Sequence, residues 1–463
     1  MRAVARSIPV LAVVIAAVVA AGVRGDFKDL LVYQHAGRAL LDGASVYGDR
    51  VGGLRFTYPP VAAILATPLA WPPAWLAAAL WTAASVGALA VVLVIVLREQ
   101  GRPAPGWLVA LLVCGALAFE PVWQNLTFGQ VNLLLMLAVL TDLLRPERRW
   151  SGLLVGLAAG VKLTPLVLVV MLALVGHPRA AARAALTFAA TVAVGYVAMP
   201  RAATSYWTDD VVRAGRVGPP ELAHNQSVYG ALTRLLDDPP PVLLWLAVAG
   251  PLALAVLLVG AAWWRRGDRV LGGCLAALAM LLASPVSWSH HWVWAVPLAL
   301  VLWERSRWAA VAWSAVFVAR PILWPPWGEH REFAWSPFDH VVGNAYVLAA
   351  LALAGWTGAV LARSRLAVSG GAPVSGDGSG GRAGDHHGLA RAVVAAGQEG
   401  VQLVTAPRAR QTVREVGVPG LDGVPHGRAS FLPRTLLGVA SLSMSPDRRR
   451  RYDSSGGGTV AEV

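Results

Sequence analysis

The chain has little charge and few of the residue types from which soluble enzymes build their reactive centres. Only 14% of its 463 residues are charged and 56% are hydrophobic, whereas roughly 25% of an average soluble domain is charged. Lysine occurs twice, at Lys28 and Lys162, and cysteine twice, at Cys114 and Cys274, both within apolar runs. This composition excludes an ordinary soluble domain, and it indicates neither a disulfide framework nor a thiolate metal site.

Two sequence patterns are also absent. The sequence contains no G-x-x-x-x-G-K-[ST] loop and no alternating strand pattern, so nothing indicates a soluble domain that binds a nucleotide sugar. The formal net charge is +13, carried almost wholly by arginine. In so apolar a chain, we interpret this charge through membrane topology and not through nucleic-acid binding.

Long apolar runs fill the first three quarters of the chain. They predict an all-α polytopic membrane protein with about 10–12 transmembrane segments. The first run, residues 8–23, follows Arg2 and Arg6, and we interpret it as an uncleaved first helix, with a cleaved signal peptide as the alternative. The later expected spans are residues 74–97, 107–119, 131–144, 180–199, 242–264, 270–283, 288–303, 308–323 and 342–361.

Two apolar stretches are interrupted. Prolines break residues 61–97 after a short piece that is predicted to be re-entrant or interfacial. Residues 152–175 are broken at Lys162-Leu163-Thr164-Pro165 into halves too short for separate spans. The second pattern predicts a hairpin whose tip carries Lys162.

If the expected spans alternate in direction, the arginine-rich loops between them all fall on one side of the membrane. Because cationic flanks stay cytoplasmic, this pattern predicts a plasma-membrane protein with cytoplasmic N- and C-termini. The opposite, extracytoplasmic face then receives residues 26–60, 120–130, 200–241, 284–287 and 324–340. Residues 1–365 form the expected membrane domain. Residues 366–463, rich in Gly and Ser at their start, are expected to be a disordered cytoplasmic tail.

The outer loops carry several candidate functional side chains. Asp29, with Asp26 nearby, follows the first expected helix, where a carboxylate can act as a base or be a solvated loop charge. Glu120, Asn125, Gln130 and Asn132 precede an apolar run, which fits either helix capping or bonding to a hydroxyl-rich ligand.

Three further candidates lie later in the chain. Lys162 falls in an apolar hairpin, where a charge indicates function unless it snorkels to the surface. Asn225 and Gln226 fall in the long loop, where ordinary loop polarity is the competing interpretation. His290 and His291 lie among tryptophans, and as neighbours they are poor joint metal ligands. One histidine can instead meet a phosphate.

These residue types together suit sugar transfer from a lipid-linked phosphosugar. Such a reaction needs a carboxylate to accept the proton of the acceptor hydroxyl and cationic or hydrogen-bonding groups for the departing phosphate. Aromatic side chains can pack on the sugar. No metal or other cofactor is required by this reading.

An ordered series of short motifs carries a family resemblance. It runs through Asp29-Leu30-Leu31-Val32-Tyr33, Phe56-Thr57-Tyr58-Pro59-Pro60, Gly129-Gln130-Val131-Asn132, Lys162-Leu163-Thr164-Pro165, Asn225-Gln226-Ser227 and Ser284-Pro285-Val286-Ser287-Trp288 with His290-His291. The series resembles glycosyltransferase family 87, the actinobacterial polyprenyl-phosphate-mannose-dependent α-(1,2)-mannosyltransferases. The resemblance covers the membrane body and not the tail.

The resemblance implies a GT-C fold and mannose transfer, with inversion, to a mannosylated lipid-anchored glycan at an extracytoplasmic site. It implies Asp29 as general base. Lys162 with His290 or His291 would hold the donor phosphate, and Gln130, Asn132, Asn225 and Gln226 would line the sugar site. Asp26, Glu120 and Tyr58 are accessory candidates. The expected partners are the polyprenyl donor, the lipid acceptor and membrane lipids, with no nucleic acid.

Two alternatives stay open. A transporter or flippase would also be polytopic, but it more often shows two similar halves with paired broken helices, and the break at Lys162 has no obvious counterpart. Another GT-C enzyme, such as an arabinofuranosyltransferase, would share the mechanism and use a different sugar. Phosphatidylinositol mannosides and lipomannan branches both fit as acceptors.

Overall fold

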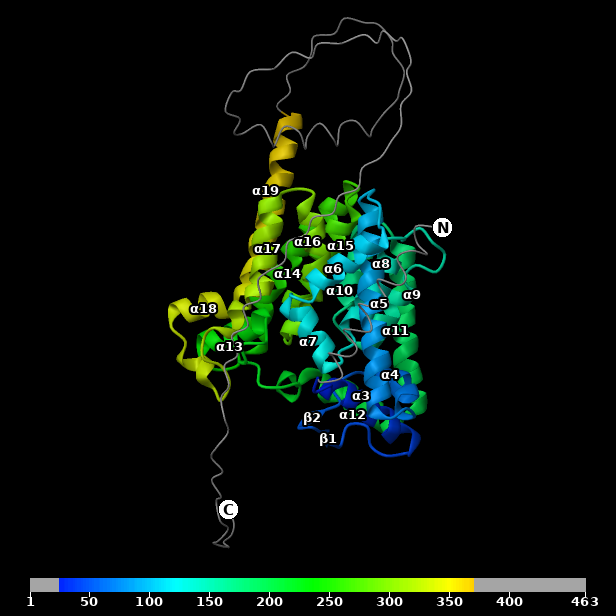
Figure 1. The fold of residues 1–463 in the computed structure, drawn as a ribbon. Coiled ribbons are helices and arrows are strands. Elements are labelled where there is room, and N and C mark those ends of the chain that lie inside the picture. Colours follow the sequence, from blue (N-terminus) through cyan, green and yellow to red (C-terminus); the bar gives the residue numbers. More distant parts are fainter. Residues whose placement is uncertain (1–24, 370–463) are drawn as a thin grey trace, which may run out of the picture. The chain divides into compact units, whose positions relative to one another are not determined.

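The computed structural model describes residues 25–369, which are mostly helical (Figure 1). The expected first helix, at residues 8–23, and nearly all of the expected tail lie outside the described residues. The proposed boundary at residue 365 falls inside the last described helix, which continues to Ser369.

The first half contains α3 (Lys28–Leu41), β1 (Arg50–Val51), β2 (Leu54–Arg55), α4 (Pro60–Ala66), η1 (Thr67–Ala70), α5 (Ala74–Glu99), α6 (Gly106–Ala116), α7 (Glu120–Phe128), α8 (Asn132–Leu143), α9 (Leu153–Val161), α10 (Leu166–Leu174) and α11 (Pro178–Ala198). The second half contains α12 (Pro200–Thr208), η2 (Asp210–Val212), η3 (Ala214–Arg216), α13 (Val228–Leu236), α14 (Val242–Arg265), α15 (Arg269–Ala283), η4 (Ser289–Trp294), α16 (Ala295–Trp303), α17 (Arg307–Ala319), η5 (Pro321–Leu323), η6 (Arg331–Ala334), α18 (Pro337–Gly343) and α19 (Ala345–Ser369).

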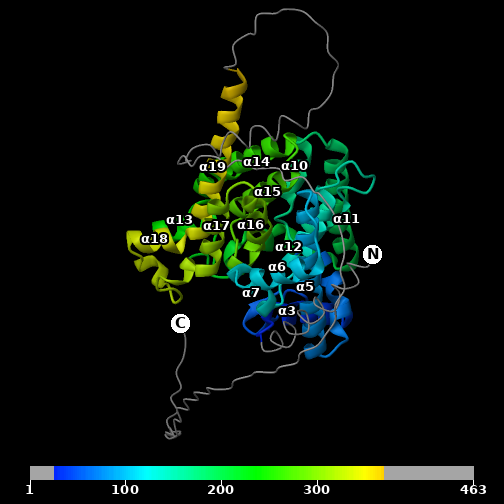
Figure 2. The same cartoon turned by 45° about the horizontal axis from the view of Figure 1, so that its top comes forward.

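The core of the helical body is built around α15. Every residue from Val270 to Leu282 is buried, as expected of a helix that is apolar on all sides. Helices α14, α10 and α16 contact it, and Figure 2 shows α15 surrounded by these neighbours. By contrast, α14 exposes Leu243, Leu254 and Leu258, a surface suited to lipid.

Within residues 25–369, four helices are long and apolar enough to cross a membrane. They are α5, α11, α14 and the Ala345–Ser364 part of α19. A fifth span results if α6 and α7, bent by 86°, count as one. The expectation of about 10–12 spans is therefore too high for this part of the chain by length and composition. Several of the predicted spans, such as α8 and α15, are shorter helices of the interior.

The predicted interruptions are present. Helix α4 and the turn η1 precede the long α5, as expected for a short piece before a span. The stretch 152–175 is divided into α9 and α10 at Lys162, whose backbone is extended at φ −149° and ψ 123°. Thr164 and Pro165 follow in the connecting turn, where proline cannot continue the preceding helix.

Three glycines on α9 face α11 at close range. Gly152, Gly156 and Gly160 recur every fourth residue, and a Cβ at Gly156 would lie 2.7 Å from Thr187 Cβ. A Cβ at Gly160 would meet Thr191 Cβ at the same distance. This small-residue stripe allows the two helix backbones to approach closely, which fixes α9 and with it the Lys162 turn.

We expect Gly156→Ala to destabilise the protein by about 1–3 kcal/mol, because the new methyl group overpacks a closed interface. The measurement is the thermal unfolding midpoint of the detergent-purified protein. Gly87→Ala on α5 is the matched control, since a Cβ there meets nothing within 4 Å. An unchanged midpoint for Gly156→Ala, equal to that of the control, would contradict the close packing.

The arginine-rich loops meet at one end of the helices. Ion pairs join Arg145 to Glu99 at 2.6 Å and Arg269 to Glu147 at 2.5 Å, and others join Arg102 to Glu304 and Arg305 to Asp268. These contacts link the loops that follow α5, α8, α14 and α16. The sequence prediction that these loops share one side is confirmed.

A second, smaller apolar cluster surrounds α3. It includes Phe27, Leu30 and Tyr33 of that region, with Phe56 after β2 and Ala63 on α4. In Figure 1, α3, β1, β2 and α12 lie together at the lower end of the view. The sequence analysis placed residues 26–60 in an outer loop, whereas the helix α3 begins at Lys28. Asp29 is therefore a helical residue and not a loop residue.

Candidate active site

Asp29 lies in the first turn of α3, at the end where backbone N–H groups favour a negative charge. The residue before α3, Phe27, adopts a left-handed conformation at φ 43° and donates its N–H to Thr127 O at 2.9 Å. This bond joins the start of α3 to the last turn of α7. Asp29 is thus held on a rigid element beside residues 127–132.

A tyrosine and glutamine cluster contacts Asp29. The Tyr33 and Tyr58 hydroxyls lie 2.7 Å apart, and they lie 3.0 and 2.9 Å from Gln130 Oε1. Gln130 also forms a side-chain hydrogen bond with Asp29. Because its oxygen faces the tyrosines, its Nε2 is the group that donates to the carboxylate. The structure therefore brings three predicted residues, Asp29, Tyr58 and Gln130, into one cluster.

Burial raises the pKa of Asp29 from 3.8 to about 6. The hydrogen bond from Gln130 and the charges of Lys28 and Lys162 act in the opposite direction, with smaller effects. A carboxyl group with this pKa is still ionised at neutral pH, and it is a stronger base than an ordinary aspartate.

Gly129 makes the turn that presents Gln130. Its φ is 68°, a left-handed conformation that glycine adopts without strain. A Cβ at this position would lie 2.6 Å from Leu30 Cβ on α3. Both the conformation and the close approach require glycine, and they place Gln130 against the face of α3 that carries Asp29.

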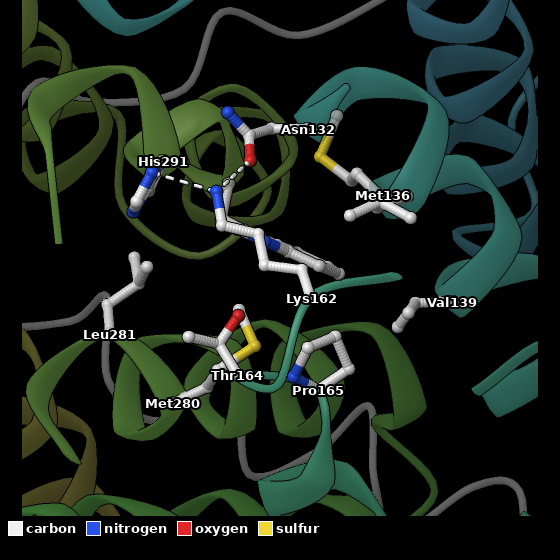
Figure 3. A pocket seen from close by; sticks show the side chains of 11 residues that line it. Asn132, Met136, Val139, Lys162, Thr164, Pro165, Met280, Leu281 and His291 are labelled. Atoms are coloured by element: carbon white, nitrogen blue, oxygen red, sulfur yellow. Dashed lines mark hydrogen bonds between the residues drawn. The ribbon is translucent and has the colours of Figure 1, made fainter. Parts of the chain in front are cut away.

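Lys162 extends from the α9–α10 turn toward Asn132 and His291 (Figure 3). Its Nζ donates to Asn132 Oδ1 at 2.8 Å and lies 2.8 Å from His291 Nε2. It also lies 5.9 Å from the centroid of the Tyr58 ring. The contact with Tyr58 connects Lys162 to the cluster around Asp29. Apolar residues, among them Met136 and Leu281, line the small cavity beside it.

Asn132 is fixed from two directions. Its Nδ2 donates to Asn125 Oδ1 at 3.1 Å and to His290 O at 3.0 Å. Asn125 in turn donates to Gln130 O at 3.1 Å. These bonds leave Asn132 Oδ1 to accept from Lys162, so the amide cluster predicted after Glu120 orients the lysine.

The two histidines are buried in η4 and pack edge to face, with ring centroids 4.7 Å apart. A lysine ammonium has no lone pair, so His291 Nε2 accepts from Lys162 and the proton of a neutral His291 resides on Nδ1. Within the described residues, His291 Nδ1 and His290 Nε2 have no hydrogen-bond partner. Buried polar atoms of this kind are available to a ligand.

Asn225 and Gln226, which are predicted to line a sugar site, bond to backbone groups of the interior. Both are fully buried. Asn225 Oδ1 accepts from Ser287 N at 3.0 Å, and its amide nitrogen donates to loop carbonyls. Gln226 donates to Gly343 O at 2.7 Å and accepts from Tyr346 N at 3.2 Å. Their polar atoms are used by the backbone, so these residues hold the long loop in place.

Two of the accessory candidates, Glu120 and Asp26, have different surroundings. Glu120 is 1% exposed and accepts hydrogen bonds from Ser289 Oγ at 2.7 Å and Tyr346 Oη at 3.0 Å. It therefore anchors the start of the turn that carries His290. Asp26 is exposed, three residues before Asp29.

Three residues to which the sequence analysis assigned no role, Lys28, Tyr33 and His224, also belong to this region. Lys28 Nζ lies 3.7 Å from the centroid of the Phe128 ring, and its charge acts on both Asp29 and His290. The rarity of lysine is the sequence feature that could have identified Lys28, because both lysines of the chain lie at this site. Tyr33 lies one helical turn after Asp29, a spacing that places the two on one face.

The arrangement brings a basic carboxylate and a cationic group close to Tyr58. Such a pair can take a proton from a hydroxyl group and stabilise an anion that departs from the same substrate. In the part of the chain that the structure describes, no group of three His, Cys, Asp or Glu side chains is placed to hold a metal ion.

Comparison with known proteins gives one family. Residues 56–285 match the sequence profile of glycosyltransferase family 87. No solved structure matches the chain significantly.

Two curated mycobacterial proteins are similar over most of their length. A polyprenol-phosphate-mannose-dependent alpha-(1-2)-phosphatidylinositol pentamannoside mannosyltransferase of Mycobacterium tuberculosis is 37% identical over 368 residues, 72% of this chain and 81% of the relative. A polyprenol-phosphate-mannose-dependent alpha-(1-2)-phosphatidylinositol mannoside mannosyltransferase of Mycolicibacterium smegmatis is 37% identical over 364 residues, 70% of this chain and 82% of the relative.

Proposed function

The chain belongs to glycosyltransferase family 87, and from this premise we propose that it transfers mannose from polyprenyl-phosphate-mannose to a mannosylated lipid acceptor. The product has an α-(1,2) linkage, formed with inversion. One observation carries the proposal for this site: Asp29, with its raised pKa, and Lys162 meet around Tyr58 and Gln130. The relatives named above supply the donor and the class of acceptor.

In the proposed reaction, Asp29 accepts the proton of the acceptor's 2-hydroxyl group. The hydroxyl oxygen attacks the anomeric carbon from the face opposite the phosphate, and the bond from that carbon to the phosphate oxygen breaks. Polyprenyl phosphate leaves with the electron pair. Lys162 and the free nitrogens of His290 and His291 stabilise its charge, while Gln130 and Tyr58 orient Asp29. No step is assigned to a metal.

The proposal includes a GT-C fold, an extracytoplasmic active site and cytoplasmic termini. Its support is the position of the site along α5. Near the start of that helix, Gln34 of α3 donates to Pro72 O at 2.9 Å. The ion pair of Arg145 with Glu99 lies at the other end, about 39 Å away for a helix of 26 residues. Cationic loops stay cytoplasmic, so the Asp29 end faces outward. The proposal also treats residues 1–365 as the catalytic domain and residues 366–463 as a separate tail.

The direct test is transfer of labelled mannose from synthetic polyprenyl-phosphate-mannose to a mannosylated lipid by the purified protein. We expect a labelled product whose new linkage is cleaved by an α-(1,2)-specific mannosidase. No product with any mannosylated acceptor, but product from a polyprenyl-phosphate arabinose donor, would favour the other GT-C chemistry. Movement of a lipid-linked glycan across vesicles without any transfer would favour a flippase.

The pH dependence follows from Asp29. Only the ionised carboxylate accepts a proton, so on the acid side kcat/KM should fall about tenfold per pH unit well below pH 6. The raised pKa therefore moves the loss of activity to a higher pH than an ordinary aspartate would. Initial rates between pH 4.5 and 8 provide the measurement. A profile that stays flat down to pH 5 would contradict Asp29 as the base.

A further inference from the structure

An open trough of aromatic and proline side chains lies in the loop between η5 and η6. It is lined by Trp324, Pro325, Pro326, Trp327, Gly328, Glu329 and Arg331. Trp324 is 62% exposed and Trp327 is 42% exposed. Two large indole rings and two charged side chains therefore share one accessible surface.

The loop that forms the trough is held rigidly. Trp335 Nε1 donates to Pro326 O at 2.7 Å, and Trp324 Nε1 donates to Ala319 O at 3.0 Å. The Gly328 N–H donates to the buried Glu332 Oε1 at 2.9 Å. Proline restricts the backbone further. Such a surface binds a ligand with little loss of conformational entropy.

The trough adjoins the active site through His224. The Trp327 ring packs edge to face against His224, with centroids 4.9 Å apart. Glu332 also accepts from Ala223 N at 3.1 Å, which fixes the segment that carries the histidine. Burial, together with the charge of Lys28, lowers the pKa of His224 to about 4, so this ring is neutral at physiological pH.

Electrostatic interactions link His224 and Lys28 to the reacting groups. His224 and Lys28 both act electrostatically on His290, and Lys28 acts on Asp29. His224 therefore contacts the trough directly and lies within electrostatic range of His290.

We propose that this trough is an acceptor subsite, which holds mannose units of the acceptor next to the one that receives the new sugar. The inference rests on the proposed function. A pyranose ring has an apolar C–H face that packs on an indole, and its hydroxyl groups match the Glu329 and Arg331 side chains. The relative that is named for a pentamannoside acceptor shows that such acceptors carry several sugars beyond the reacting one.

The other reading of exposed tryptophans is a belt at the membrane interface. The two interpretations predict different effects on the choice of acceptor. A sugar subsite distinguishes acceptors by their number of mannose units, whereas an interface belt affects membrane insertion and treats all acceptors alike.

The experiment compares two synthetic acceptors with the same octyl chain, one with a single α-mannose and one with four. Loss of a stacking contact costs up to about 1.5 kcal/mol, which corresponds to roughly tenfold. We expect Trp327→Ala to lower the ratio of kcat/KM for the tetramannoside to that for the monomannoside by this factor. Trp327→Phe should keep most of the ratio. Trp308→Ala, an exposed tryptophan on α17 outside the trough, should keep all of it.

The subsite would be overturned if Trp327→Ala kept the wild-type ratio, whether kcat/KM stayed the same or fell by the same factor with both acceptors. If the wild type transfers mannose to neither acceptor, the proposed function fails, and the trough is judged separately by binding. Saturation-transfer NMR with free α-mannotetraose then reports contact with the wild type and a weaker signal with Trp327→Ala. Equal signals from the two proteins, or none from the wild type, would reject the subsite.

Discussion

Asp29→Asn should lower the rate of mannosyl transfer by roughly 10²–10⁴-fold, the usual contribution of a general base. Asparagine has nearly the same shape and can still hydrogen-bond with Gln130, so the cluster with Tyr33 and Tyr58 should be preserved. What is lost is the acceptor for the proton of the attacking hydroxyl. The measurement is kcat with labelled donor at saturating acceptor.

Two controls make the Asp29 result specific. Asp42→Asn removes an exposed carboxylate at the other end of α3 and should leave the rate unchanged. Donor affinity, measured by competition with polyprenyl phosphate, should be retained in Asp29→Asn. Full activity of this variant would reject Asp29 as the base. Asp26→Asn, tested in parallel, then shows whether the exposed neighbour shares the work.

Lys162→Met should lower kcat/KM by roughly 10²–10³-fold, the cost of removing one preorganised group that stabilises developing negative charge. Methionine keeps most of the length of the side chain in its apolar surroundings, and removal of a buried cation leaves the hydrophobic packing in place. Asn132 Oδ1 and His291 Nε2 lose their common partner. Competition by polyprenyl phosphate should weaken together with the rate.

The Lys162 prediction also separates chemistry from folding. Size-exclusion profile and helical circular dichroism should match the wild type, because Lys162 lies in a turn and its backbone makes only one helix-terminal bond. A variant that folds, binds polyprenyl phosphate as tightly as the wild type and keeps its rate would show that Lys162 is a structural residue.

Much of the candidate site could be predicted from the sequence because membrane chains restrict where charge is tolerated. A lysine inside an apolar run must be paired or line a cavity, which singled out Lys162. The place of Asp29 after the first expected helix, together with the family resemblance, singled out this carboxylate. Neither inference depends on distant contacts.

The surroundings of other residues depend on contacts that the sequence does not show. Asn225 and Gln226 are polar residues in a loop, a context typical of ligand binding, yet their side chains bond to backbone groups and to Ser287 in the interior. A sequence pattern does not reveal which buried backbone groups lack partners, and such groups must be satisfied first. The number of candidate spans depends on the same information, since a helix such as α15 is apolar all round and is covered by protein.

The sequence by itself determined the apolar helical body, the arginine-rich side and the break at Lys162. These features follow from local composition and from the cost of placing charge in an apolar medium. Only the tertiary structure decided that Tyr33 meets Gln130 across 97 positions and that Lys162 meets His291 across 129. Contacts at such separations arise from helix packing, which depends on close approaches such as Gly129 against Leu30, and no local pattern encodes them.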